Sequence, residues 1–121
     1  MPGTIHRQAG LTVLELPDQG GPLGALDIIG ETYGQGVDWV AIPASRLPAD
    51  FFSLRSGVLG EFTQKFVNYG LRLAVIGDVS AHIEASEAFR AYHVEANRGP
   101  GIRFADDMAG LLDNLGRQPG R

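Results

Sequence analysis

Residues 51–78, FFSLRSGVLGEFTQKFVNYGLRLAVIGD, constrain the fold more than any other stretch of the chain. The first part carries apolar residues at helical spacing, which predicts an amphipathic helix. Gly70 suits the end of that helix. The apolar run that follows lacks polar alternation, as is typical of a parallel strand covered on both faces. We therefore expect a helix and a buried strand at the centre of an α/β domain.

Similar segments alternate along the rest of the chain. Residues 4–8 and 11–16 are short strand candidates, separated by an Ala-Gly pair that suits a hairpin turn. The patterns then predict a helix opened by Pro22, a strand over residues 38–43, the central helix and strand, a helix after Ser80, a strand over residues 101–105 and a short helix ending at Gly116. The predicted order is ββαβαβαβα.

This order predicts a single α/β domain over residues 1–116 and a frayed tail over residues 117–121. Alternating strands and helices favour a mostly parallel sheet with right-handed crossovers. We expect a five-stranded mixed sheet with four helices. The expected buried faces are Pro22, Leu26, Ile29 and Tyr33 on the first helix, Val58, Phe62, Phe66 and Tyr69 on the second, and Ala85, Phe89, Tyr92 and Ala96 on the third.

Composition excludes several classes of protein. The chain has no cysteine, which removes disulfides, thiolate zinc sites and cysteine nucleophiles. The net charge is −4, and the ten basic residues form no stripe of the kind that nucleic-acid binding needs. No apolar run approaches the roughly 20 residues that span a bilayer, and the first residues lack the apolar core of a signal peptide. We expect a cytoplasmic protein that binds neither nucleic acid nor membrane.

The carboxyl ends of the predicted parallel strands should form the functional rim, because ligands of such sheets favour that edge. The polar residues that follow the strands and open the helices are Asp18, Ser45, Arg46, Arg55, Ser56, Asp78, Ser80, His82, Asp106 and Asp107. Of these, Arg46, Arg55, Ser56, Asp78 and Ser80 are the candidates for binding or regulation, together with Gly57.

Ser56 stands directly before the central helix and has two interpretations. As a helix cap, its oxygen accepts a hydrogen bond from a free N–H of the first turn. As a regulatory site, it would be phosphorylated where the helix dipole favours negative charge, with Arg55 available to pair with the phosphate or another anion. Gly57 and Gly60 predict the close approach of another backbone, either the sheet or a partner, because glycine is costly within a helix.

The remaining polar residues favour structural roles. Asp78, Ser80 and His82 alternate in one loop, a spacing that rarely forms a catalytic triad, and no nucleophile elbow is present. The three histidines lack the spacing of a helical metal site, and no glycine motif matches a dinucleotide or phosphate loop. We therefore predict no catalytic residue, no metal and no cofactor.

Three motifs carry a resemblance to a known family. They are GVDWVAIP at residues 36–43, the stretch at residues 51–78 and FRAYHVEANRG at residues 89–99. On these motifs the chain, from about Leu11 to Leu115, resembles the bacterial family catalogued as "domain of unknown function 4180". That resemblance implies no activity or ligand.

The element order also resembles the STAS domain of sulfate-transporter tails and anti-sigma-factor antagonists. In those antagonists a serine before the second helix is phosphorylated by a partner kinase, and LRSGVLG places Ser56 at that position. The sequence differs from their pattern at Leu54 and Arg55, where acidic and small polar residues are usual. The resemblance implies a STAS-like fold.

These observations support two functional hypotheses. The first is a non-enzymatic protein-interaction or regulatory module that captures a protein partner through Arg55, Ser56 and Gly57 with Asp78 and Ser80. The second is a small-molecule or anion-binding protein, extending to an enzyme, that uses the same rim with Arg46 or Arg55. A homodimer that pairs exposed apolar helix surface is a third alternative.

Overall fold

The computed structural model describes residues 3–32, 34–96 and 102–116. Its strands are β1 Thr4–Gln8, β2 Leu11–Glu15, β3 Trp39–Pro43, β4 Arg72–Ile76 and β5 Ile102–Ala105. Its helices are α1 Ala25–Thr32, α2 Val58–Asn68, α3 Ser80–Ala85, α4 Glu87–Ala96 and α5 Met108–Gly116. The expected order of strands and helices is confirmed, except that two helices occupy the third helical segment. The prediction of a frayed tail lies outside the described residues.

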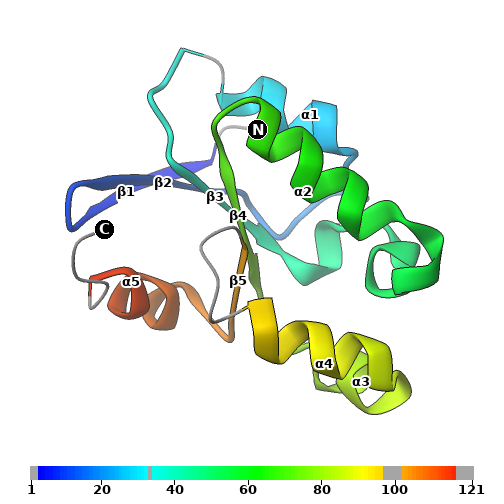
Figure 1. Cartoon of the computed structure of the whole chain (residues 1–121). Helices are drawn as coiled ribbons and strands as arrows, with labels where there is room; N and C mark the ends of the chain where they lie inside the picture. Colours follow the sequence, from blue (N-terminus) through cyan, green and yellow to red (C-terminus); the bar gives the residue numbers. More distant parts are fainter. Residues whose placement is uncertain (1–2, 33, 97–101, 117–121) are drawn as a thin grey trace.

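The five strands form one mixed sheet in the order β1-β2-β3-β4-β5 (Figure 1). β1 pairs antiparallel to β2 through the hairpin at residues 9–10, where Ala9 and Gly10 both have positive φ. The other pairs are parallel, and Val40 lies beside Leu73 at the centre. This confirms the predicted mostly parallel sheet.

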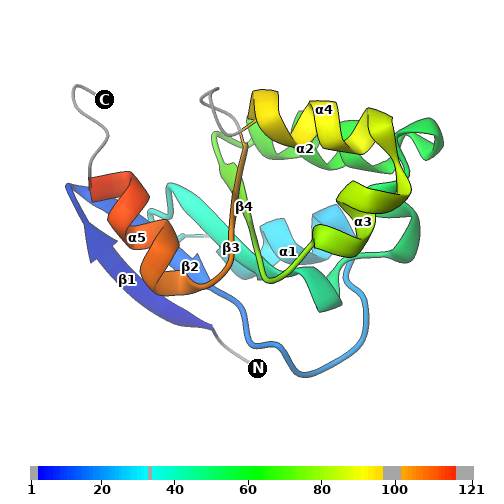
Figure 2. The same ribbon diagram turned by 90° about the horizontal axis from the view of Figure 1, so that it is seen from below.

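Helices cover the two faces unequally. Because β2 to β5 follow one another in a single direction across the sheet, right-handed crossovers place every connecting helix on the same face. Figure 2 shows α1 to α4 on that side and α5 on the other. The larger apolar cluster accordingly joins Val40, Leu73 and Val75 to Phe62, Phe66 and Phe89.

The opposite face carries a smaller core under α5. Ala41 and Ala74 are neighbours in register, and both are fully buried with Leu111 and Leu115 of α5. Their small side chains leave the volume that the leucines fill. Leu111 and Leu115 thus form the buried face of α5, and alanine is the residue that lets α5 pack close to the strands.

Trp39 lies at the edge of this smaller core, beneath two arginines. The guanidinium carbons of Arg72 and Arg103 are 5.8 Å and 5.7 Å from its ring centroid, in cation–π contact. Burial and the nearby charge of Arg72 lower the pKa of Arg103. Arg103 reaches the indole across Ala74, which is its partner in register.

Three details of the helical predictions are wrong. On the second helix, Phe62 and Phe66 are buried as expected, but α2 ends at Asn68 and Tyr69 is 62% exposed. α1 begins at Ala25 rather than Pro22, and it buries Ala25, Ile28, Ile29 and Thr32, while Leu26 is 58% exposed. These four positions, at i, i+3, i+4 and i+7, face the sheet. The buried face of α1 is therefore rotated about the helix axis relative to the predicted one. Tyr33 lies outside the described residues.

The third helical segment is broken rather than continuous. α3 ends at Ala85, Ser86 is extended, and the hydroxyl oxygen of Ser86 accepts a hydrogen bond from the Phe89 N–H at 3.1 Å. Ser86 therefore caps a new helix, α4. The change of axis buries Phe89 completely and leaves Ala85 exposed, which corrects the predicted single stripe.

The long connection between β3 and α2 is compact. It forms three short 3-10 turns, Ala44–Arg46, Ala49–Phe52 and Leu54–Ser56. Phe51 and Phe52 are buried and make edge-to-face contact with Phe62 and Phe89 respectively. This pair of rings anchors the start of α2 against the core.

Ala74→Leu tests the close packing of α5. The added methylene and methyl groups have no space between β4 and α5, so we expect a loss of about 1–3 kcal/mol in the free energy of unfolding. Ala91→Leu, on the exposed face of α4, adds the same volume and should change it by less than about 0.5 kcal/mol. Urea denaturation measures both, and equal effects would contradict this account of the α5 face.

Candidate functional site

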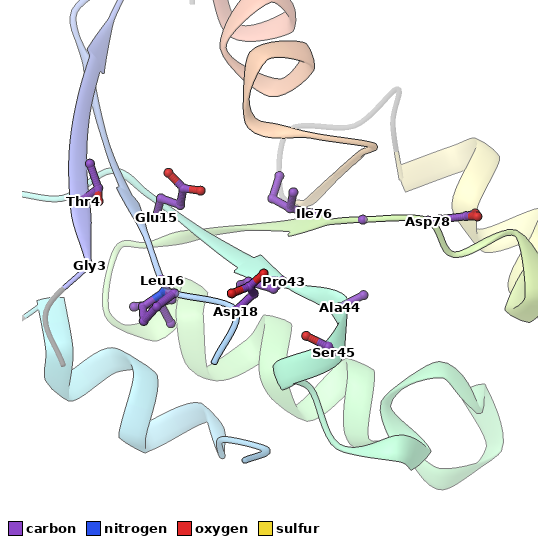
Figure 3. A pocket seen from close by; sticks show the side chains of 12 residues that line it. Gly3, Thr4, Glu15, Leu16, Asp18, Pro43, Ala44, Ser45, Ile76 and Asp78 are labelled. Carbon is purple, nitrogen blue, oxygen red and sulfur yellow. The ribbon is translucent and has the colours of Figure 1, made fainter. Parts of the chain in front are cut away.

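A depression of about 590 Å³ lies at the carboxyl ends of β2, β3 and β4, the edge where ligands of parallel sheets bind. Residues 15–18 form one wall and residues 43–45 the floor, while residues 76–78 close the far end. Gly3 and Thr4 complete it, because antiparallel β1 brings its first residues to the last residues of β2. We call this depression the rim cleft (Figure 3).

Gly3 is required where β1 enters the rim cleft. A Cβ at this position would overlap the Glu15 carbonyl oxygen, so only glycine lets the two strands approach here. Thr4 is paired in register with Glu15. The hairpin thus supplies one side of the cleft, although its two strands are the least apolar of the sheet.

The polar lining of the rim cleft is acidic. Glu15, Asp18 and Asp78 supply carboxylates, and Thr4 and Ser45 supply hydroxyls. Among the described residues that line it there is no Lys, Arg or His. In Figure 3, Glu15 rises from the end of β2 and Asp18 from the loop after it, while the Asp78 carboxylate points away toward α3. The potential inside the cleft therefore favours positive charge.

Glu15 has a partner at the margin of the cleft. Its Oε1 lies 2.8 Å from Nε2 of His6, and both side chains are partly exposed. The two residues are diagonal neighbours across the β1–β2 pair. This contact orients one carboxylate oxygen of Glu15 toward the hairpin.

Asp78 caps the start of α3. Its Oδ1 accepts a hydrogen bond from the Ser80 N–H at 2.9 Å. Hydrogen bonds from the Ser80 side chain and N–H lower the pKa of Asp78 below its ordinary value of 3.8. Since the folded-state pKa is the lower one, the stabilising contribution of the ionised carboxylate is present near neutral pH. It is lost as the pH falls through the folded-state value.

Arg46 turns its guanidinium into the protein. Its Nε donates to the Gly21 carbonyl at 2.9 Å and its Nη1 to the Pro17 carbonyl at 2.8 Å. Only 8% of the residue is exposed, and no carboxylate of a described residue lies within 4.0 Å of its charge. Arg46 thus lies behind the wall of the rim cleft and does not line it.

Ser56 is tied to the backbone around it. Its hydroxyl oxygen lies 2.6 Å from the Asp50 carbonyl and 2.8 Å from the Ser53 carbonyl, either of which can accept its proton. The same oxygen accepts from the Val58 N–H at 3.1 Å, in the first residue of α2. Ser56 therefore has the geometry of the predicted cap, while its side chain stays at the surface.

Gly57 has a local explanation. It adopts φ 79°, the left-handed conformation that ends the 3-10 turn and begins α2. Neither Gly57 nor Gly60 has a described atom within 4 Å of the position that a Cβ would take. The sheet therefore does not approach them, and that alternative of the prediction is wrong.

His82 packs against the aromatic core. Its ring is stacked on Phe52 with centroids 3.9 Å apart and planes 9° apart. The Ser80 N–H is already bound to Asp78. Asp78 and Ser80 thus make the local contact expected at the start of the helix, whereas His82 is partly buried against the aromatic core. Asp107 likewise caps α5, its Oδ1 accepting from the Gly110 N–H at 2.7 Å.

The structure thus separates the predicted residues into three sets. Asp18, Ser45 and Asp78 line the rim cleft, and Arg46 lies behind it. The remaining predicted residues do not line it: Arg55, Ser56, Gly57, Ser80, His82, Asp106 and Asp107. The prediction missed Glu15 and Thr4. A carboxylate near the end of the mostly apolar segment LTVLEL was the available signal for Glu15, whereas Thr4 reaches the cleft only through hairpin pairing.

Two further classes of site find no support in the part of the chain that the structure describes. No group of three or more His, Asp or Glu side chains there is arranged to hold a metal ion. No described helix is long and apolar enough to cross a membrane.

The fold and the rim cleft define a small α/β protein with a mixed, mostly parallel sheet and an acidic depression at its carboxyl edge. A family model described as "Domain of unknown function (DUF4180)" matches residues 9–115. The chain belongs to this family. No curated protein and no solved structure matches the chain significantly.

Ser56→Ala tests the cap at the start of α2. Loss of the acceptor for the Val58 N–H should lower the free energy of unfolding by about 1 kcal/mol. Ser53→Ala is the matched control, because its side chain is exposed and makes no hydrogen bond with the described residues around it. Urea denaturation should give a lower free energy of unfolding for Ser56→Ala than for Ser53→Ala. A Ser56→Ala variant as stable as wild-type protein would contradict the capping role.

Proposed function

We propose that this protein is a non-enzymatic binding module that takes a ligand with an ammonium or guanidinium group in the rim cleft. The observation that carries the proposal is the lining itself, in which the Glu15 and Asp18 carboxylates and the hydroxyls of Thr4 and Ser45 line a concave site without a basic side chain. Such a lining attracts a cation and repels a free anion.

The arrangement of the lining suits this class of ligand. Glu15 and Asp18 lie on one wall and can accept charge-assisted hydrogen bonds, which are stronger than neutral ones. Ser45 offers a further acceptor. Leu16, Pro43 and Ile76 supply apolar surface for an aliphatic stem of the kind that lysine and arginine carry.

The charge of the cleft supports a cationic ligand rather than the anion considered from the sequence. An anion site needed Arg46 or Arg55 to line the cleft beside Asp78. The Arg46 guanidinium instead binds the Pro17 and Gly21 carbonyls, and Arg55 does not line the cleft. These contacts favour a cationic group, either on a free small molecule or on a side chain of a protein partner.

Agmatine, a guanidinium with an aliphatic amine stem, is a suitable probe. Titrated into ¹⁵N-labelled protein, it should shift the amide resonances of Asp18, Ser45 and Gly77 at millimolar concentration. Asp18→Asn and Glu15→Gln should each weaken its binding about two- to fivefold, the range for partly exposed ion pairs. Asp78→Asn should have a smaller effect, because that carboxylate faces Ser80.

Three controls make the titration decisive. Glu84→Gln removes an exposed carboxylate outside the cleft and should leave binding unchanged. Glutamate should produce no shifts at the cleft. A capped Gly-Arg-Gly peptide distinguishes the source of the cation, because binding of the peptide but not of agmatine indicates a protein partner. Shifts with glutamate, or none with either cation, would contradict the proposal.

A second candidate function, regulation through Ser56, is favoured by the contacts of its hydroxyl. The side chain is exposed and links Asp50, Ser53 and Val58 around the start of α2. A phosphate on this oxygen cannot donate the hydrogen bond to either carbonyl, and it adds about −1.5 to −2 charges beside the helix N-terminus. We propose that modification of Ser56 reorganises this turn and so changes capture of a protein partner, the regulatory role that the STAS resemblance implies.

Ser56→Asp tests this switch in a pull-down from the native host. The substitution should weaken capture of a partner that wild-type protein and Ser56→Ala retain, because only it adds charge at the turn. Ser53→Asp, which places the same charge three residues earlier, is the matched control. Identical sets of captured proteins for Ser56→Asp and wild type would end the switch hypothesis.

A further inference from the structure

The wall of the rim cleft that carries Asp18 is built around Arg46. Residues 17–21 form a loop without regular structure between β2 and α1. The main-chain hydrogen bonds that bracket it are Leu16 N–H to the Ala41 carbonyl at 3.0 Å and Leu23 N–H to the Arg46 carbonyl at 2.9 Å. Between these two points, the Arg46 side chain binds the carbonyls at both ends of the loop.

The surroundings of Arg46 show that the loop and the guanidinium are fitted to each other. Gly20 has φ 115°, and a Cβ there would lie 2.9 Å from Nη2 of Arg46. Glycine therefore lets the loop close over the guanidinium. Asp18, Gln19, Gly20 and Gly21 are all exposed, so little apolar burial holds them in place.

A buried guanidinium satisfied by carbonyl oxygens in place of a carboxylate is an uncommon arrangement, because burying a charge is costly. Here it has a specific consequence. Two donors of one planar group hold carbonyls four residues apart, so the group defines the path of the chain between them. Asp18 lies on that path and lines the cleft.

We propose that Arg46 is a positioning residue for the rim cleft: it latches the loop of residues 17–21 and thereby directs Asp18 at the ligand. The loop is the adjustable wall of the cleft, and release of the latch opens that wall without disturbing the sheet. This role rests on the proposed function for its ligand, while the latch itself is independent of it.

Backbone dynamics test the latch without any ligand. In wild-type protein, the ¹⁵N order parameters of the Asp18 to Gly21 amides should approach the value of about 0.85 that rigid backbone shows. Arg46→Met, which keeps most of the side-chain length but donates nothing, should lower them below about 0.6. Arg46→Lys replaces the two donating N–H groups of the guanidinium with one ammonium, so its order parameters should lie between those of wild-type protein and Arg46→Met.

Arg55→Met is the matched control, since Arg55 is an exposed arginine that does not line the cleft. It should leave the order parameters of residues 18–21 unchanged. Gly20→Ala approaches the same question from the loop side, because its Cβ would crowd the guanidinium and alanine is also strained at a φ of 115°. It should loosen the loop even if Arg46→Met fails to fold. A loop that is already flexible in wild-type protein, or equally rigid in these variants, would overturn the latch.

A double-mutant cycle connects the latch to the ligand. In wild-type protein, Asp18→Asn should weaken agmatine binding about two- to fivefold. In the Arg46→Met background the same substitution should have no further effect, because the loop no longer presents Asp18. The change in net charge from Arg46→Met cancels in this comparison.

The two measurements separate the latch from the proposed function. If agmatine binds neither protein, the proposed function fails, and the order parameters alone decide the latch. If agmatine binds and Asp18→Asn weakens it equally in both backgrounds, the positioning role of Arg46 is wrong while the cation site stands.

Discussion

The one-directional order of the parallel strands is the constraint on which the rest of the structure depends. Right-handed crossovers between β2, β3, β4 and β5 place α1 to α4 on the same face of the sheet. The opposite face is then left to α5, and the sheet meets that helix with Ala41 and Ala74. The two alanines where α5 lies on the central strands, and the larger core on the opposite face, are both consistent with this single feature of the topology.

The same order brings the ends of β2, β3 and β4 together at one edge, while the antiparallel hairpin adds the start of β1. The result is an acidic depression with rigid strand ends beneath it and loops around it. Asp18 and Ser45 lie in connections after the strands, where the backbone makes no hydrogen bonds of the sheet. Their positions depend on side chains such as Arg46 that satisfy exposed carbonyls in place of a neighbouring strand.

The sequence predicted most of the fold because burial on two faces leaves a clear pattern. WVAIP and the LAVI that follows Arg72 are apolar at successive positions and lie in interior strands. The spacing of Phe62 and Phe66 marks the buried face of α2. The errors lie where a local contact outweighs periodicity. Ser86 ends one helix and caps another through a single hydrogen bond, and α1 turns so that Leu26 is exposed.

The sequence by itself therefore determined the order of the strands and most of the core, and it predicted the edge at which the rim cleft lies, since each follows from local spacing and from strand direction. Only the tertiary structure decided the character of that site. Contacts between residues far apart in the chain turn Arg46 toward the Pro17 and Gly21 carbonyls and away from the cleft. Such contacts also bring Glu15 and Thr4 to the same cleft as Asp18. Local patterns carry no information on such contacts, because side-chain direction at a strand end or in a loop is set by packing and hydrogen bonding.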